Sequence, residues 1–384
     1  MILILRFYTH EAIPLSKIVI FTGSLSSFIL NTRLKHPVRK ARAIDYNLII
    51  VIAPNLLFGT MLGVTLNKIL PNVLIILFLT IVLFYNTYKT TKMGLKEYRQ
   101  ENERLIKKEE SERSEENPPH NLTNNQISSG QSADNGSNNH EIEQHQKETL
   151  IEIQKDNKIL RWDKLQFVII PYIVMVALSL LRESSYVPPC SVIYWVIFTS
   201  FCLFAMLVNF ITLGHIKKEY YYRMNIGFPY DGKDIIWTSG KCIQMGITGL
   251  TSGFIAGTIG IGGGVVLGPL LLGLGIYPVV STVTTNFLVL LTSSSTSLQF
   301  ILYNMMNYEY AIISIAFSVA GSYIGTKIIH YYFKQTGRES LLIFALVLVI
   351  GSSALILPIS SILSTINDVH RGIDVFRFRS PCSY

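Results

Sequence analysis

Between Cys242 and Tyr308 the sequence contains no aspartate, glutamate, lysine, arginine or histidine. A soluble domain would need solvated side chains within a stretch of this length, whereas one bilayer crossing needs only about 20 apolar residues. Other charge-free stretches each approach the length of one crossing: Tyr46–Leu66, Ile69–Tyr88, Leu165–Leu181, Ser184–Gly214, Tyr310–Thr326 and Ser340–Asn367. The absence of charge therefore favours a polytopic all-α membrane protein, a transmembrane helix bundle, over a soluble protein with buried helices.

The sequence also lacks the patterns of common catalytic and metal sites. It has no HExxH or GxSxG motif, and no paired carboxylates fall in the apolar stretches. Four cysteines (Cys190, Cys202, Cys242 and Cys382) show neither metal-binding nor disulfide spacing, so we expect them to be structurally incidental. We therefore expect no enzyme activity, no metal and no cofactor.

The basic residues lie beside the apolar stretches. The formal net charge is +8, and five lysines and arginines fall between residues 33 and 42, in the loop between two expected crossings. Cytoplasmic loops of membrane proteins carry such an excess of positive charge. We expect this loop and the segment 89–164, two crossings further on, to be cytoplasmic. The partner that this pattern predicts is a lipid bilayer, with no nucleic acid.

Composition divides the chain into five parts. Residues 1–88 are expected to form a first membrane repeat, 89–164 a charged, low-complexity linker, 165–239 two linking helices and a basic connector, 240–358 a second repeat, and 359–384 a tail. The polar run Asn117–His140 holds too few apolar side chains to order itself. About eight full crossings are expected at roughly 20 residues each. Ile261–Gly275 either spans the membrane or re-enters it.

The two membrane repeats share features in the same order. Asp45-Tyr46 precedes a Gly59-x-x-x-Gly63 pair, and Asn307-Tyr308 precedes Gly321-x-x-x-Gly325, with 262 residues between all matched positions. The hydroxyl clusters Thr22–Ser27 and Thr292–Ser297 match at 270 residues. Transporters built from repeats bind substrate at the repeat interface. The pattern leaves open whether the repeats are inverted or parallel. The first repeat has no counterpart of the segment Cys242–Gly268. Either the first repeat is truncated, or the element formed by this segment occurs only once in the protein.

Glycines interrupt the expected helix in the stretch GLTSGFIAGTIGIGGGVVLGP, Gly249–Pro269. Gly260, Gly262, Gly263 and Gly264 each cost a helix about 1 kcal/mol relative to alanine. One interpretation is a kink whose backbone groups bond to neighbouring helices. The other is a broken helix whose free N–H groups and positive dipole end face an anion. A nucleotide loop is excluded because no Lys-Ser/Thr pair follows.

Hydroxyl and amide groups supply further candidates for substrate binding. Thr284, Thr285 and Asn286 follow Pro278 closely and either donate to an oxyanion or cap a helix. The run Thr292–Ser297 either lines a cavity or bonds between helices. Ser16 and Lys17 occupy the matching position in the first repeat. Lys17 either attracts an anion or extends to the membrane interface.

The segment Gly249–Phe287 resembles the signature region of the sulfite exporter TauE/SafE family, in which a GxGGG cluster, a downstream proline and an Ala-Thr-Ser-like element recur in each half. Val283-Thr284-Thr285 matches the last element. KQTGRESLLIF in the second half, and EAIPLSKIVIFTGSLSSFI and HPVRKARAIDYNL in the first, also resemble the family. The resemblance implies a permease for sulfite, sulfonates or related sulfur-containing anions, driven by a coupling ion. The family's first glycine-rich helices have no counterpart here.

Two functions are consistent with these patterns. The first is a secondary transporter of a small inorganic or organosulfur anion. The alternative is a non-transporting membrane scaffold or receptor that recruits partners through the linker 89–164. The sequence indicates no oligomeric state.

Overall fold

The computed structural model describes residues 9–36, 38, 41–116, 147–158, 161–184, 187–188, 190–230, 234–259, 263–302, 306–336, 338–370 and 378. The main elements in these ranges are helices: α2 (Thr9–Asn31), α3 (Tyr46–Ile69), α4 (Asn72–Glu116), α6 (Trp162–Arg182), α7 (Val192–Asn225), α8 (Ser239–Ile259), α9 (Gly264–Gly273), α10 (Pro278–Leu302), α11 (Tyr308–Thr336) and α12 (Ser340–His370). Residues 147–156 add a short helical segment. The predicted all-α bundle is confirmed.

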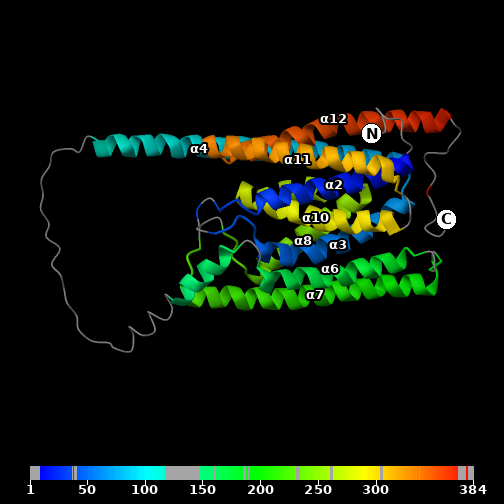
Figure 1. Ribbon diagram of the computed structural model, residues 1–384, viewed down its shortest axis with the longest axis horizontal. Coiled ribbons are helices and arrows are strands. Elements are labelled where there is room, and N and C mark those ends of the chain that lie inside the picture. Colours follow the sequence, from blue (N-terminus) through cyan, green and yellow to red (C-terminus); the bar gives the residue numbers. More distant parts are fainter. Residues whose placement is uncertain are drawn as a thin grey trace, which may run out of the picture.

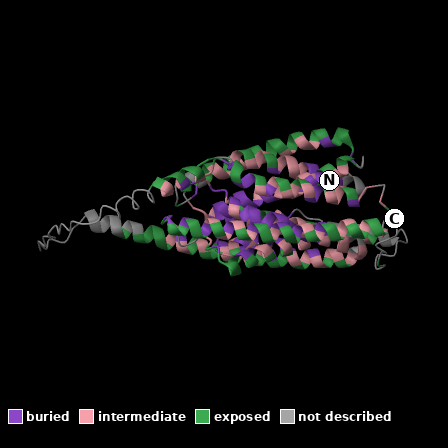
Figure 2. Cartoon of the chain, turned by 90° about the horizontal axis from the view of Figure 1, so that it is seen from below, coloured by how far each residue is buried: buried purple, intermediate pink, exposed green. Residues whose placement is uncertain are grey.

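The helices run along one common axis (Figure 1). In this view α4, α11 and α12 lie on one side, α6 and α7 on the other, and α2, α3, α8 and α10 between them. Buried residues gather in the middle of the bundle (Figure 2). The outer helices expose large apolar side chains, among them Phe210 of α7 at 80% and Phe317 of α11 at 76%. Such surfaces suit contact with lipid tails.

Helix α3 forms the centre of the core. Leu48, Ile49 and Ile52 are each fully buried, and they belong to one apolar cluster with residues of α6, α8, α9 and α10. The burial of these side chains among residues of four other helices shows that α3 is surrounded within the bundle. Its position next to α8 and α10 places the glycine-rich segment at the core of the protein.

Seven helices in the described ranges are long and apolar enough to cross a membrane. Neither α2 nor α10 is among them, although both lie inside the bundle beside these seven (Figure 1). Lys17 and several hydroxyls lower the hydropathy of α2, and Thr292–Ser297 lower that of α10. Because other helices shield these two from lipid, they need not be apolar.

Helix α4 continues well beyond its expected crossing at Pro71–Tyr88, as far as Glu116. Its second half is rich in glutamate and lysine, which are good helix formers and pair at four-residue spacing. The polar run Asn117–His140 lies outside the described residues. We call the end of the bundle at which α4 leaves and α6 begins the linker end.

Two features differ from expectation. Helix α12 continues through Pro358 to His370, past the point at which the tail was predicted to begin. Cys190, in the loop between α6 and α7, is disulfide-bonded, so the prediction that all the cysteines are incidental is wrong for this one. Cys202 and Cys242 are free. Cys382 lies outside the described residues.

Candidate functional site

The glycine-rich segment is a broken helix. Helix α8 ends at Ile259, and α9 begins at Gly264. Gly260 and Gly262, both candidate ligands for the anion, lie outside the described residues. Gly263 precedes α9, and as a glycine it has no side chain that could cap the first amides of that helix. The first turn of any helix leaves N–H groups without an intrahelical partner, so α9 presents such groups at the break.

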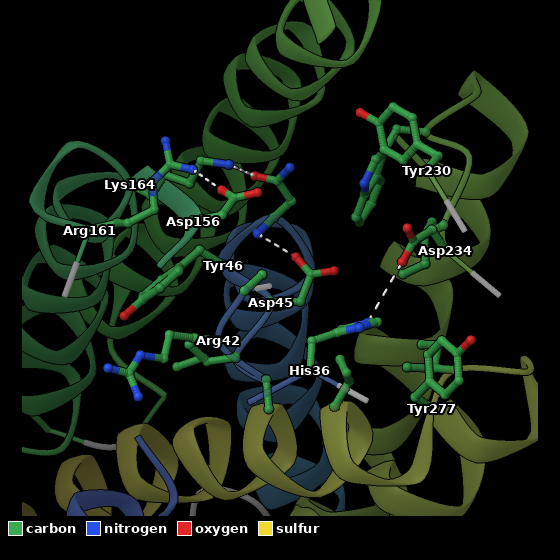
Figure 3. Close-up of a pocket in the computed structure, with 18 of the residues that line it drawn as sticks. His36, Arg42, Asp45, Tyr46, Asp156, Arg161, Lys164, Tyr230, Asp234 and Tyr277 are labelled. Atoms are coloured by element: carbon green, nitrogen blue, oxygen red, sulfur yellow. Dashed lines mark hydrogen bonds and ion pairs between the residues drawn. The ribbon is translucent and has the colours of Figure 1, made fainter. Parts of the chain in front are cut away.

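Helices α8 and α9 together form a hairpin, in which α8 is long enough to cross the membrane. Asp234, before α8, and Tyr277, after α9, line the same pocket at the linker end of the bundle (Figure 3). The chain therefore enters and leaves at one end. Helix α9 has 10 residues, which corresponds to a length of about 15 Å, half of what a crossing needs. Helix α9 is thus too short to cross the membrane by itself, and α10–α12 run opposite to α2–α4.

Glycines allow α8 to approach α3 closely. A Cβ atom on Gly253 would lie 2.1 Å from the carbonyl oxygen of Leu56, and one on Gly257 would lie 2.4 Å from that of Thr60. On the opposing helix, a Cβ on Gly63 would lie 2.2 Å from the carbonyl oxygen of Phe254. Real Cβ atoms do not come this close to backbone. These glycines therefore serve packing and hold the break at a fixed depth.

The start of α9 is enclosed by α3 and α10. A Cβ on Gly264 would lie 2.3 Å from Cγ2 of Val289 and 3.4 Å from Cγ2 of Thr285. A Cβ on Gly263 would lie 3.5 Å from Leu56, in the middle of α3. The free amides of α9 therefore lie deep in the bundle, against the side of α10 that carries Thr285.

Thr284 and Thr285 are adjacent but differ in their bonding. The Thr284 hydroxyl accepts a hydrogen bond from the Asp45 amide at 3.4 Å, so it ties α10 to the start of α3. Thr285 is 8% exposed, and its hydroxyl has no hydrogen-bond partner among the described residues. A buried hydroxyl without a partner costs about 1–3 kcal/mol. Of the two threonines, Thr285 is the one that lies beside Gly264 and has a hydroxyl without a partner among the described residues.

The other candidate residues lie apart from the break. Asn286 Nδ2 donates to the carbonyl oxygen of Ser24 at 3.3 Å and lines a separate cavity. Ser16 and Lys17 lie about 12 Å from that contact, toward the start of α2, at 1.5 Å per residue. Both residues have interactions of their own. The structure therefore does not bring Ser16 and Lys17 together with Asn286.

The hydroxyl run on α10 bonds mainly to its own helix. Ser293 Oγ donates to the carbonyl oxygen of Val289 at 2.6 Å. Ser294 Oγ lies 2.7 Å from the Tyr172 hydroxyl of α6, which joins the two helices. Ser297 is 2% exposed, and its hydroxyl has no partner among the described residues. Part of the run thus links helices, and Ser297 alone resembles Thr285.

A pocket of about 80 Å³ opens at the linker end, below α9 (Figure 3). His36 Nε2 lies 3.9 Å from Asp234 Oδ1, and the His36 ring meets Tyr277 edge-on at 5.1 Å. The Asp45 carboxylate caps α3 by accepting from the amides of Asn47 and Leu48. Sequence reasoning missed this pocket, because its walls come from segments nearly 200 residues apart.

One wall of the pocket is an ion network. Asp156, the last residue of the short helical segment, pairs with Arg161 at 2.7 Å and with Arg223 of α7 at 3.0 Å. Glu152 and Glu219 complete the pairing of Arg223. Burial alone raises the pKa of the Asp156 carboxyl, but the hydrogen bond and charge of Arg223, with the charge of Arg161, outweigh it and hold this pKa below its ordinary value of 3.8. The network fastens the end of the linker to α6 and α7.

Comparison with known proteins agrees with this architecture. The family described as sulfite exporter TauE/SafE matches residues 150–356. Sulfite exporter TauE/SafE family protein 3 of Arabidopsis thaliana is 29% identical over 383 residues, which cover 100% of this chain and 76% of the relative. Protein 2 of the same plant family is 27% identical over 382 residues, covering 96% and 78%. No solved structure matches the chain. The chain belongs to the sulfite exporter TauE/SafE family.

Proposed function

We propose that this chain is a secondary permease that moves sulfite, a sulfonate or a related sulfur-containing anion across its membrane. Its family membership supports transport of such an anion. The observation that carries the proposal is the uncapped start of α9 beside the unpaired Thr285 hydroxyl. We assign the anion to Gly263, Gly264 and Thr285, which lie at this point, and we retain the sequence candidates Gly260 and Gly262, which lie outside the described residues, as part of the same hypothesis.

The chemistry of this site suits an anion. The amides of α9 and the Thr285 hydroxyl are donors, and the positive end of the helix dipole points at the break. No charged residue occurs between Cys242 and Tyr308, so no carboxylate from this part of the chain repels the ligand. Glycine lets an oxyanion reach the backbone because it has no Cβ. The site binds through dipoles rather than a fixed cation, which favours release as well as binding.

The pocket at the linker end supplies the approach. Its walls carry both basic residues (Arg42, Arg161, Lys164 and Arg223) and carboxylates (Asp45, Asp156 and Asp234), so it offers a polar, hydrated entrance to the bundle. The pocket lies where α8 begins and α9 ends, so the hairpin connects it to the break. The anion passes between pocket and break along α9 and α10.

Flux into proteoliposomes tests the proposal. Vesicles that contain the full chain should take up sulfite or sulfoacetate faster than empty vesicles. Gly263→Leu should abolish this uptake, because the side chain fills the break. Gly214→Leu on α7, where a Cβ would meet nothing within 4 Å, is the matched control and should leave uptake unchanged. Equal uptake by the Gly263→Leu variant and the native chain would refute the site.

A scaffold that acts through its linker is the second candidate. It is favoured by the length of α4, which continues past the other helices at the linker end (Figure 1). Deletion of Asn117–His140 distinguishes the two functions. If the chain is a transporter, vesicles that contain the deletion variant should still take up the anion. If the chain is a scaffold, vesicles that contain even the native chain should show no uptake.

A further inference from the structure

Helices α2 and α11 are joined by a regular ladder of polar contacts. Ser318 Oγ of α11 donates to the carbonyl oxygen of Val19 at 2.6 Å, and Ser322 Oγ donates to that of Gly23 at 2.7 Å. The partners in both contacts are 299 positions apart, and each contact lies one turn beyond the last. The two helices therefore run in the same direction and in register.

The next two contacts of the ladder join side chains instead of backbone. Thr326 Oγ1 lies 3.1 Å from Ser27 Oγ, and His330 Nε2 lies 3.0 Å from Asn31 Oδ1. They keep the separation of 299 positions. The two hydroxyls of the Thr326–Ser27 contact can exchange donor and acceptor, and His330 Nε2 must donate to Asn31 Oδ1, which leaves Nδ1 of the ring for another partner. The first two contacts have no such freedom, because a carbonyl oxygen only accepts.

The side-chain contacts open into a cavity of about 190 Å³ between α2, α10, α11 and α12. One water needs about 10–15 Å³ of such space, so the cavity has room for a small oxyanion. Its polar lining consists of hydroxyl, amide and imidazole groups, from Ser27, Asn31, Thr282, Asn286, Thr326 and His330. Among the described lining residues, none carries a carboxylate.

His330 is the one titratable group among those described lining residues. The charged groups on the surrounding elements lie beyond the walls. On α11, the Lys327 ammonium sits over the Tyr323 ring at 4.7 Å. Helix α2 carries Lys17 and is followed by Arg33, Glu339 precedes α12, and α10 has no charged residue. Glu11 of α2, Glu309 and Lys334 of α11, and Asp368 of α12 are likewise not among the described lining residues. Of those lining residues, His330 is therefore the one that could supply positive charge to an anion in the cavity.

We propose that this cavity is a second station for the transported anion, and that His330 takes up one proton when the anion binds. The inference rests on the proposed function. With Nε2–H donated to Asn31 Oδ1, the lone pair of Nδ1 accepts a proton from solution. The protonated ring then donates Nδ1–H to the anion and balances its charge. When the anion leaves, the proton returns to solution. Asn286, which lines this cavity, directly follows Thr285 in α10, so the two stations lie on different faces of the same helix.

Thermodynamic linkage makes the proposal measurable. If protonated His330 binds the anion, then the anion raises the pKa of His330. Reciprocally, affinity rises as the pH falls, by up to about tenfold per pH unit for one linked proton. Sulfate is a suitable probe because it does not titrate near neutral pH. The full chain, purified in detergent with carbon-13-labelled imidazole rings, allows both quantities to be followed by NMR and calorimetry.

Three variants define the outcome. His330→Gln keeps an N–H donor for Asn31 but does not titrate. It identifies the His330 signal among the eight histidines of the chain, and its sulfate affinity should be weak and independent of pH. Asn31→Asp places a negative charge in the cavity and should also weaken sulfate binding. His215→Gln is the control, because His215 stacks on Phe167 at 4.4 Å, away from the cavity; its affinity should follow pH as the native chain does.

The inference and the proposed function fail separately. A His330 signal that sulfate does not move, or pH-dependent binding that survives His330→Gln, overturns the inference even if vesicles transport sulfite. Vesicles without flux overturn the proposed function, whether or not sulfate raises the pKa of His330. A native chain that transports sulfite, and in which sulfate raises that pKa, supports both.

Discussion

Gly59 of α3 faces the backbone of Leu250 of α8 so closely that a Cβ on Gly59 would lie 2.2 Å from the Leu250 carbonyl oxygen. The matching glycine of the second repeat, Gly321 of α11, has nothing within 4 Å of its Cβ position. The same sequence motif therefore packs against a helix in one half and faces open space in the other.

This pair predicts opposite responses to one substitution. Gly59→Ala should separate α3 from α8 and lower the stability by about 1–3 kcal/mol, the usual range for overpacking. Gly321→Ala should be neutral or stabilising by up to about 1 kcal/mol, because alanine favours helix. Thermal unfolding in detergent measures both. Equal loss of stability in the two variants would show that α11 is covered by another helix.

Thr285→Val tests the unpaired hydroxyl. The substitution removes one donor to a charged ligand, worth about 1.5–3 kcal/mol, so kcat/KM for sulfite uptake should fall roughly 10- to 100-fold. The melting temperature should stay the same or rise, because no partner is lost. Thr212→Val is the matched control: Thr212 is 2% exposed, but its hydroxyl donates to the carbonyl oxygen of Asn209 at 3.0 Å. Sulfite uptake by the Thr212→Val variant should be unchanged. A similar fall in kcat/KM in both variants would contradict the assignment of Thr285 to the anion site.

The ion network predicts acid sensitivity at the end of the linker. The folded pKa of Asp156 is lowered, so its contribution to stability is complete above its ordinary pKa and is lost as the pH falls through the folded value. Protease cleavage within residues 147–158 should therefore increase as the pH is lowered from about 5 towards 3.

Substitution within the network gives a sharper test. Asp156→Asn should open the segment at neutral pH, at a cost on the order of 3 kcal/mol for a buried pair that loses one partner. Asp163 also pairs with Arg161, but its side chain is 60% exposed, so Asp163→Asn should cost at most about 1 kcal/mol. Equal cleavage of the two variants would mean that the network does not hold the linker.

Glycosylation tests the orientation of the bundle. The linker contains the sequons Asn121-Leu122-Thr123 and Asn135-Gly136-Ser137, and we expect neither to carry a glycan in a cell that glycosylates secreted domains. A sequon inserted after Ser184, between α6 and α7, should be modified. Disulfides persist in oxidising compartments, so this orientation predicts that the Cys190 disulfide forms on the same side of the membrane as the inserted sequon. A glycan at Asn121 or Asn135 would reverse the assignment.

Most of the helices were predictable because lipid restricts composition over whole segments. The charge-free stretches Leu165–Leu181 and Tyr310–Thr326 fall within α6 and α11. Helix ends were less predictable: the glutamates and lysines of α4 and the residues after Pro358 continue helices on propensity and local pairing. The polar helices α2 and α10 are identified as central only when their neighbours are known.

The site was predictable in part, for a physical reason. Four glycines in five positions cannot sustain a helix, so the break after Ile259 follows from local sequence. Which of two adjacent threonines is unpaired depends on packing, and Thr284 and Thr285 differ only in what lies next to them. His36 and Asp234 meet because the hairpin of α8 and α9 brings their segments together, and no local sequence pattern around either residue predicts this contact.

One apolar core is shared across the linker. Ile49 of α3, Met245 of α8 and Leu267 of α9 belong to it, so the segments before Glu116 and after residue 147 hold each other without the peptide between them. Two polypeptides made separately, one from each side of that connection, should assemble into the same bundle. Selection on the helices therefore leaves the connection free to lengthen, shorten or divide into two genes.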